Sequence, residues 1–282
     1  MSDVTGIKPP ILAGVIGFPI GHSRSPIMHS HWLKKYGIHG HYIPISLSAP
    51  DFVAGIRSLP RLGFRGINIT IPHKVSMLGL ADSVTDRAAL IGAVNTVTFK
   101  DDGSMRGDNT DGYGFIQNMR QNAPSWDPKS GPALVLGAGG AARAVISALL
   151  SEGVTELRLA NRTRQRAELL ADQFGAKVQV VDWIHASDAV DGAMTIVNTT
   201  SLGMQGQPDL IIDLSAAPKA AVVTDLVYTP LNTPFLEGGA ALGLHTVDGL
   251  GMLLYQGVPG FELWFGTRPE VDESLRMAIL DK

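Results

Sequence analysis

The stretch LVLGAGGAAR, residues 134–143, decides the fold of the second half of the chain. An apolar run ends at a glycine cluster and a run of small residues follows, which predicts a strand, a tight turn and a helix. The spacing fits G-x-G-x-x-A: Gly137 permits the turn, Gly139 lets the backbone approach a pyrophosphate, and Ala142 lets the helix pack closely on the strand. The N–H groups at the helix start would hold the phosphates. The alternative is a close-packed turn without a ligand.

The next strand, expected over 156–160, decides which dinucleotide such a turn would bind. An NAD site carries Asp or Glu at this strand end for the ribose 2′-hydroxyl. Here the strand runs into NRTRQR, residues 161–166, so Asn161 stands there and arginines follow. A guanidinium matches a phosphate, and we therefore expect NADP(H), with Arg162 and Arg166 on the 2′-phosphate. The alternative is a solvated basic helix start, although cations there oppose the helix dipole.

Around this turn the second half of the chain alternates strands and helices, which predicts a mononucleotide-binding pattern repeated along a parallel sheet. Further strands are expected over 133–136, 177–181, 193–197 and 221–226, and helices over 141–150 and 164–174. A stretch with three prolines, 123–132, separates this half from the first.

The first half also reads as α/β, with βαβ units and mainly parallel pairing. Strands are expected over 11–18, 41–47 and 64–71, and a hairpin over 95–107. Asp51 is expected to cap a helix of about a dozen residues that ends near Gly63. Ser25 is expected to cap a helix in which Pro26 is the first residue. From Asp248 onward we expect two helices with a Gly/Pro break at 258–260.

Composition bounds the function. A length of 282 residues predicts about two domains, and 45% apolar with 17% charged residues excludes a disordered chain. The net charge of −3 argues against a nucleic-acid partner, and the absence of cysteine excludes disulfides, thiol nucleophiles and Cys-based metal sites. No apolar run reaches ~18 residues, so no membrane partner is expected. Residues 1–10 lack the pattern of a secretory signal, and cytoplasm is the expected compartment.

Histidines invite a metal hypothesis that the sequence does not favour. His29 with His31, and His39 with His41, are two residues apart. Side chains at that spacing do not face each other on a helix, and no carboxylate cluster is nearby, so we expect no metal.

Four polar clusters mark element ends in the first half: SRSP at 23–26, NITIPHK at 68–74, GAVNT at 92–96 and GDNTDG at 107–112. Turns and helix caps explain any one of them. Together they suit reduction of a ketone, which needs a hydride on carbon and a proton on oxygen. A lysine can donate that proton and a carboxylate can orient it, and Ser, Thr and Asn side chains suit a polyol acid.

These motifs occur in one order along the chain, followed by NTTSLGM at 198–204, DLVYTP at 225–230 and the stretch from Gly249 to Gln256. In motifs and order the chain resembles the shikimate dehydrogenase family over essentially its whole length. The resemblance implies NADPH-dependent, reversible reduction of 3-dehydroshikimate to shikimate, a step of aromatic amino acid biosynthesis.

The resemblance also implies two α/β domains flanking a cleft. A substrate domain with a mainly parallel sheet would cover 1–112 and 250–282, with the C-terminal helices returning to it. A Rossmann-type NADP-binding domain would cover 113–249.

By the same resemblance, site residues can be named. Lys74 and Asp111 are the catalytic pair, and the substrate ligands are Ser23 and Ser25 for the carboxylate and Asn68, Thr70, Asn95, Tyr228 and Gln256 for the hydroxyls. The cofactor residues are Gly137, Ala138, Gly139, Gly140, Ala141, Ala142, Asn161, Arg162, Thr163, Arg166 and Thr199, with Met204, Leu226, Gly249 and Met252 near the nicotinamide. His73 carries no implication.

Alternatives stay open at this point. Related enzymes oxidise quinate, often with NAD, and a non-catalytic NADP-binding regulator could use the same fold. A nearby Asp111 favours a charged Lys74, but the sequence leaves open whether Lys74 transfers the proton or only positions the carbonyl. It leaves monomer and homodimer equally open.

Overall fold

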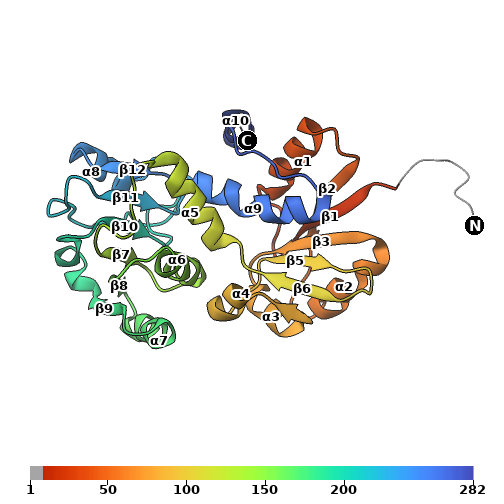
Figure 1. Ribbon diagram of the computed structural model, residues 1–282, viewed down its shortest axis with the longest axis horizontal. Coiled ribbons are helices and arrows are strands. Elements are labelled where there is room, and N and C mark those ends of the chain that lie inside the picture. The colour runs from red at the N-terminus through yellow and green to blue at the C-terminus, as the bar shows by residue number, and fades with distance from the viewer. Residues whose placement is uncertain (1–8, 282) are drawn as a thin grey trace, which may run out of the picture. The chain divides into compact units, whose positions relative to one another are not determined.

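The computed structural model describes residues 9–281 and divides the chain into two compact units (Figure 1). The first unit runs to Thr110 and resumes at Gly257, and the second covers Asp111–Gln256. The chain passes between them at α5 (Asp111–Asn122) and within α9 (Leu250–Phe265). The stretch 1–8, on which the expectation about a secretory signal mostly falls, lies outside the described residues.

The second unit is built on a six-stranded sheet in which every neighbouring pair is parallel. Its strands are β7 (Ala133–Leu136), β8 (Leu157–Asn161), β9 (Val178–Asp182), β10 (Thr195–Asn198), β11 (Val222–Asp225) and β12 (His245–Val247). They lie in the order β12-β11-β10-β7-β8-β9, as Figure 1 shows. This is the order of a doubly wound dinucleotide fold, and its strand order reverses between β7 and β10.

Helices cover both faces of this sheet and close two apolar cores. The helices are α5, α6 (Gly140–Ser151), α7 (Arg164–Phe174) and α8 (Pro234–Ala241). Alternate residues of β7 serve the two faces: Val135 packs with residues of α5, α6 and α7, whereas Leu134 and Leu136 pack with residues of α8. Burial on both faces explains why β7 is apolar throughout.

The first unit holds a mixed six-stranded sheet in the order β2-β1-β3-β5-β6-β4. Its strands are β1 (Ile11–Gly17), β2 (Gly40–Ser46), β3 (Phe64–Ile69), β4 (Ser83–Val84), β5 (Thr96–Phe99) and β6 (Met105–Asp108). β1 pairs in parallel with β2 and β3, and β4 with β6, while β5 runs antiparallel to both β3 and β6. The expected hairpin supplies these antiparallel pairs, turning at Gly103 with φ 82°.

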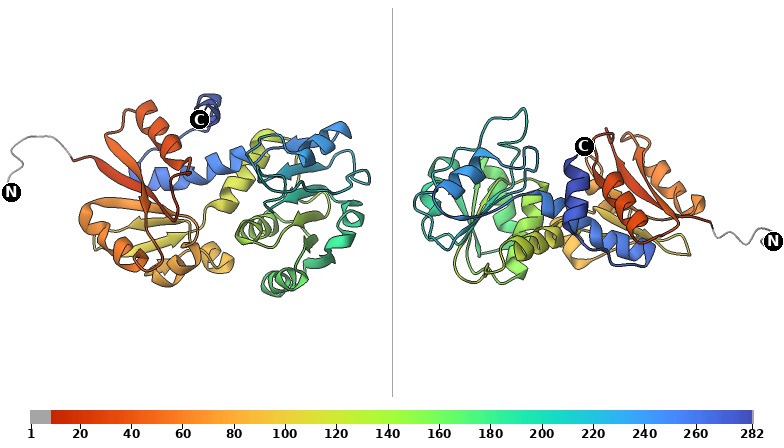
Figure 2. Two further views of the ribbon diagram at one scale, coloured as in Figure 1. Left: turned by 180° about the vertical axis from the view of Figure 1, so that it is seen from behind. Right: turned by 90° about the horizontal axis from the view of Figure 1, so that it is seen from above.

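Helices α1 (Ser25–Lys35), α2 (Phe52–Ser58), α3 (Lys74–Leu80), α4 (Asp86–Ile91) and α10 (Glu273–Leu280) belong to this unit, with the last part of α9. Figure 2 shows α10 beside α1. Trp32 Nε1 donates to the Glu270 carbonyl at 2.9 Å, and Lys35 bridges Glu270 and Asp272. Within 9–281, no helix combines the length and the apolar character needed to cross a membrane.

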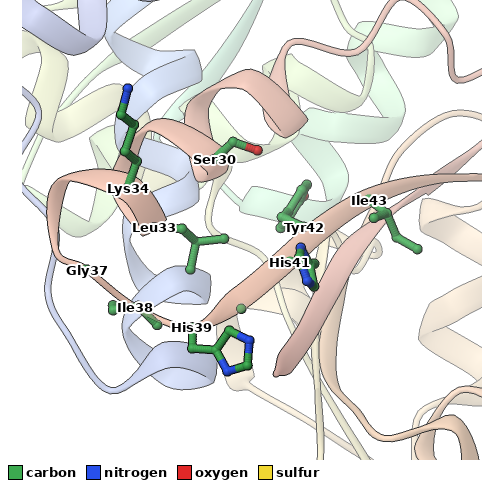
Figure 3. Close-up of a pocket in the computed structure, with 10 residues that line it drawn as sticks. Ser30, Leu33, Lys34, Gly37, Ile38, His39, His41, Tyr42 and Ile43 are labelled. Atoms are coloured by element: carbon green, nitrogen blue, oxygen red, sulfur yellow. The ribbon is translucent and has the colours of Figure 1, made fainter. Parts of the chain in front are cut away.

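β2 is an edge strand of this sheet, and a hollow of about 480 Å³ lies between it and α1 (Figure 3). The hollow is lined by Ser30, Leu33, Lys34, Gly37, Ile38, His39, Gly40, His41, Tyr42 and Ile43. These are not residues that the motifs assign to the site.

The structure corrects the expected break at 258–260: α9 is continuous through Pro259 to Phe265, and Gly266 ends it with φ 72°. Proline costs a helix interior roughly 3 kcal/mol. Phe261 and Trp264 beyond it are buried, and Trp264 Nε1 donates to the Val97 carbonyl at 3.1 Å. Burying two aromatic side chains, at about 1.5–3 kcal/mol each, offsets that cost.

The expected caps were also wrong. α1 begins at Ser25 itself, after Arg24, and the side chain of Ser25 makes no capping hydrogen bond. Asp51 likewise caps nothing with its side chain, and the helix after it ends at Ser58 and gives way to a 3₁₀ turn over Pro60–Leu62. At α1 the Ser23 hydroxyl accepts from the Ser25 backbone N–H instead. Before α2 the Ser48 hydroxyl donates to the Asp51 carboxylate.

Candidate active site

The turn before α1 carries two of the predicted substrate ligands. Ser25 is buried at the first position of the helix, and its backbone N–H donates to Ser23 Oγ at 3.3 Å. The sequence predicted that Ser25 caps the helix and gave Ser23 no capping role. In the structure the Ser23 hydroxyl binds a backbone N–H at the helix start, and the Ser25 side chain does not. The hydroxyl of Ser25 is therefore not used in capping, because Ser23 serves the backbone.

Asn68 and Asn95 are brought together by the pairing of β3 with β5, in which Asn68 lies opposite Thr96. Asn68 Nδ2 donates to the Asn95 carbonyl at 3.1 Å and to Thr96 Oγ1 at 3.2 Å. Both asparagines are buried, with 5% and 2% of their surface exposed. Two residues from Asn68, the half-buried Thr70 lies just past the end of β3, where alternation directs it to the same face.

Lys74 is the first residue of α3 and is half-buried. Its carbonyl accepts from Val94 N at 2.9 Å, next to Asn95 in the chain. The residue before it, His73, is buried, its ring stacks on Phe52 with centroids 4.1 Å apart, and Nε2 lies 2.8 Å from the Leu47 carbonyl. A carbonyl only accepts, so Nε2 is the protonated nitrogen. His73 therefore anchors the start of α3.

Asp111, the first residue of α5, is half-buried and follows a turn held by Asn95. Asn95 Oδ1 accepts from the Thr110 backbone N at 2.9 Å and from Thr110 Oγ1 at 3.1 Å. A predicted substrate ligand thus fixes the residue that precedes the predicted catalytic carboxylate.

Helices α5 and α9 pass very close to one another inside the second unit. A Cβ added at Gly114 would lie 2.6 Å from the Met252 carbonyl and 2.9 Å from Gln256 Cβ. Only glycine fits there. Because Gly114 has no side chain, α5 can lie against the part of α9 that carries Met252 and Gln256. Asp111 is the first residue of this α5 helix.

The glycine turn between β7 and α6 has the form that a bound pyrophosphate needs. Gly137 has φ 109°, and a Cβ there would lie 2.6 Å from Thr199 Oγ1, so the turn packs against a second predicted cofactor residue. At Gly139 and Gly140 an added Cβ would meet nothing within 4 Å. The helix start is therefore open to a ligand, and its N–H groups suit an anion.

The loop after β8 completes this region. Asn161, the last residue of β8, accepts from Ala138 N at 3.1 Å and donates to the Thr163 carbonyl at 2.8 Å, so one side chain ties the glycine turn to the loop. Arg164 pairs with Glu168 and Asp182 at 2.8 and 2.6 Å.

The remaining two arginines of the loop have no such partner. Arg162 and Arg166 are exposed, and within the described part of the chain neither guanidinium group makes a hydrogen bond or an ion pair. Two guanidinium groups beside a strand end that lacks an acid fit the 2′-phosphate of NADP.

A buried carboxylate that sequence reasoning missed joins two loops of the second unit. Asp225, at the end of β11, accepts from Asn198 Nδ2, Val227 N and Thr233 Oγ1 at 2.9, 2.9 and 2.7 Å. Burial raises the pKa of its carboxyl, against these hydrogen bonds, which lower it. The DLVYTP motif contains Asp225, but only the folded chain shows that it holds the loops bearing Met204 and Tyr228 in place.

Leu226 and Gly249 are in direct contact. A Cβ added at Gly249 would lie 2.4 Å from the Leu226 carbonyl, so glycine permits the turn before α9 to close on the end of β11. Of the other predicted residues, Tyr228 is half-buried, Met204 is 42% exposed, and Gln256 Nε2 donates to the Leu253 carbonyl at 3.1 Å.

Comparison with known proteins follows the same division of the chain. Residues 15–97 match the model of the shikimate dehydrogenase substrate binding domain. Residues 120–217 match that of shikimate / quinate 5-dehydrogenase, and residues 249–273 that of the shikimate 5′-dehydrogenase C-terminal domain.

Relatives and solved structures are similar to this chain over nearly its whole length. A shikimate dehydrogenase (NADP(+)) of Cereibacter sphaeroides is 60% identical over 280 residues, covering 99% of each chain. A quinate dehydrogenase from Corynebacterium glutamicum in complex with NAD has a TM-score of 0.90 at 35% identity, covering 98% of this chain and 100% of that one. A Thermus thermophilus shikimate 5-dehydrogenase in complex with NADP(H) and shikimate has a TM-score of 0.84 at 38% identity, covering 96% and 99%.

Proposed function

The chain belongs to the shikimate dehydrogenase family, and from that premise we propose how its residues carry out the NADP-dependent, reversible reduction of 3-dehydroshikimate to shikimate. The observation that carries the assignment of the reaction is the 60% identity, over 99% of both chains, to a relative named for this activity and this cofactor. The assignment of individual residues is our proposal.

The cofactor side of the proposal uses the second unit. When bound, NADPH supplies the hydride that is added to the substrate carbonyl carbon. The N–H groups after the glycine turn would hold its pyrophosphate, and Arg162 and Arg166 its 2′-phosphate. Residues assigned to the same cofactor are Gly137, Ala138, Gly139, Gly140, Ala141, Ala142, Asn161, Thr163 and Thr199, with Met204, Leu226, Gly249 and Met252 at the nicotinamide end.

The substrate side uses hydroxyls and amides. Ser23 and Ser25 at the start of α1 would bind the carboxylate of the substrate, which the helix start favours. Asn68, Thr70, Asn95, Tyr228 and Gln256 would bind its hydroxyls. These neutral groups distinguish one substrate from another by where their hydrogen-bond donors and acceptors lie. A substrate that lacks one hydroxyl leaves one of these groups without a hydrogen-bond partner, which weakens binding.

Lys74 and Asp111 are assigned to the proton. In the reducing direction the Lys74 ammonium gives a proton to the carbonyl oxygen as the hydride arrives at carbon, and in the oxidising direction the amine takes it back. The Asp111 carboxylate would orient the ammonium and balance its charge.

An absorbance assay at the NADPH band, with shikimate and quinate each offered with NADP⁺ and NAD⁺, tests the function. We expect kcat/KM to be highest for shikimate with NADP⁺. Quinate with NAD⁺ as the best pair would instead make the chain a quinate dehydrogenase, like its Corynebacterium neighbour. NADP⁺ binding without turnover of either substrate would indicate a regulator.

A further inference from the structure

The hydroxyl of Tyr42 hydrogen-bonds to one of the proposed substrate ligands, although no motif pointed to this residue. Tyr42 lies on β2 and is buried, with 4% of its surface exposed. Its hydroxyl donates to Asn68 Oδ1 at 2.7 Å. This hydrogen bond connects β2 with the end of β3.

The amide of Asn68 can adopt only one orientation in this setting. The Asn95 carbonyl cannot donate, so it requires the Nδ2 side of the amide, which also reaches Thr96 Oγ1. The two hydrogens of Nδ2 are thereby used, and Oδ1 faces Tyr42. An amide oxygen has two lone pairs, and Tyr42 takes one of them. What Asn68 can offer a ligand is therefore the second lone pair.

The ring of Tyr42 is held firmly enough to set this orientation. It stacks on His29 with ring centroids 3.8 Å apart and planes 5° from parallel, and Trp264 lies 6.3 Å away. Burial raises the pKa of the Tyr42 hydroxyl, so this group keeps the proton that it donates.

We propose that Tyr42 is a positioning residue that fixes Asn68 as a hydrogen-bond acceptor toward the substrate. This deepens the proposed function and rests on it. The proposal fixes the direction of the hydrogen bond between Asn68 and the substrate. The substrate group that faces Asn68 must be a hydroxyl that donates, because a carbonyl, ether or fluorine has no hydrogen to give to Asn68 Oδ1. The specificity of substrate binding then depends on a residue that does not touch the substrate.

Tyr42→Phe tests the proposal because it removes the hydroxyl and keeps the ring. We expect KM for shikimate, and its Kd measured by calorimetry without cofactor, to rise about 5–10-fold, the effect of losing about 1 kcal/mol. We expect kcat and KM for NADP⁺ to change less than twofold. Tyr36→Phe is the matched control: its hydroxyl accepts from Glu270 N at 2.9 Å in the same unit, and its removal should leave shikimate binding unchanged.

A double variant separates positioning from general stability. In an Asn68→Ala background, Tyr42→Phe should alter shikimate Kd less than twofold, because its partner is gone. Unchanged shikimate Kd in a folded Tyr42→Phe protein, or a parallel change in kcat and in both KM values, overturns the inference.

Two further arms keep the test decisive. Should Tyr42→Phe fail to fold, shikimate analogues with each ring hydroxyl replaced in turn by fluorine are bound to the wild type, and equal affinity for all of them overturns the inference. If the wild type itself neither binds nor oxidises shikimate, the proposed function fails, and this inference fails with it.

Discussion

At the scale of single residues, the backbone of Lys74 is held in place by neighbouring residues. The Val94 backbone N–H donates to its carbonyl, and His73 before it is stacked on Phe52 and hydrogen-bonded to the Leu47 carbonyl. These contacts fix the backbone at the start of α3. A fixed backbone limits the conformations that are open to the Lys74 side chain and so preorganises it for catalysis.

Replacing Lys74 by methionine should lower kcat by about 10²–10⁴-fold, the usual contribution of a general acid, and should change KM for shikimate much less. The reason is that the proton is needed only in the transition state. Steady-state kinetics with Lys100→Met, an exposed lysine of the same unit, serves as the control. Turnover near the wild-type rate in Lys74→Met would remove Lys74 from the catalytic assignment.

His29 gives a second prediction at this scale, about stability. It is completely buried between aromatic rings, neither ring nitrogen has a hydrogen-bond partner among residues 9–281, and burial lowers its pKa to about 3. In the unfolded chain the ring takes a proton below about pH 6.5. The unfolded state therefore binds more protons between pH 6.5 and 3, and the free energy of unfolding falls as pH falls, by up to ~1.4 kcal/mol per pH unit from this group.

His29→Phe keeps the stacking on Tyr42 and removes the titrating group, so its free energy of unfolding should decline less steeply from pH 6.5 to 4. Urea unfolding at several pH values measures the slope. The exposed His41→Gln variant should keep the wild-type slope. A slope in His29→Phe as steep as that of the wild type contradicts the prediction.

At the scale of elements, two strand ends of the second unit cooperate through one side chain. Asn161 ends β8 and binds the backbone of the glycine turn that follows β7. In an NAD site an acid would stand at this strand end. An asparagine there adds no negative charge, which leaves the adjoining Arg162 and Arg166 able to attract a phosphate.

Arg162→Ala should therefore weaken NADP⁺ binding by about 10–100-fold, the range expected for a hydrogen bond to a charged group, and leave NAD⁺ binding nearly unchanged. Dissociation constants for both cofactors, measured by fluorescence titration, give the ratio. Arg164→Ala is the control, because Arg164 is held by Glu168 and Asp182. Equal losses for NADP⁺ and NAD⁺ would refute the 2′-phosphate assignment.

At the scale of the whole molecule, each unit has a sheet and a core of its own. Two separate apolar clusters flank the sheet of the second unit, and another lies under β1, β3 and β5 of the first. The proposed cofactor residues through Met252 fall in the second unit, whereas Ser23, Ser25, Asn68, Thr70, Lys74 and Asn95 fall in the first.

Ligands should accordingly protect different units in hydrogen exchange. NADP⁺ alone should slow exchange over 137–142 and 161–166, and shikimate alone should slow it over 23–25 and 68–70. At 100 times Kd each ligand can contribute about 2.7 kcal/mol of stabilisation to the form that binds it. Protection of the first unit alone by NADP⁺ would contradict the division of roles.

The sequence alone determined much of this protein, because local patterns encode it. The α/β alternation, the strand ends and the helix over 164–174 follow from apolar periodicity, and the glycine turn follows from conformations that only glycine adopts freely. The preference for NADP and the set of candidate residues followed from short motifs and their order. The caps at Ser25 and Asp51 and the break at Pro259 were wrong because local propensity was outweighed by neighbouring hydroxyls and by burial of Phe261 and Trp264.

Only the tertiary structure decided how the site residues are held. His73, Tyr42 and Asp225 carry no local pattern that announces a role, since each acts through partners from other elements: Phe52, Asn68 and Thr233. The antiparallel pairing of β5 with β3, which brings Asn68 next to Asn95, likewise depends on contacts between segments that are distant in the sequence. Hydrogen bonds and stacking between distant segments depend on a packed backbone, and no short window of sequence contains both partners.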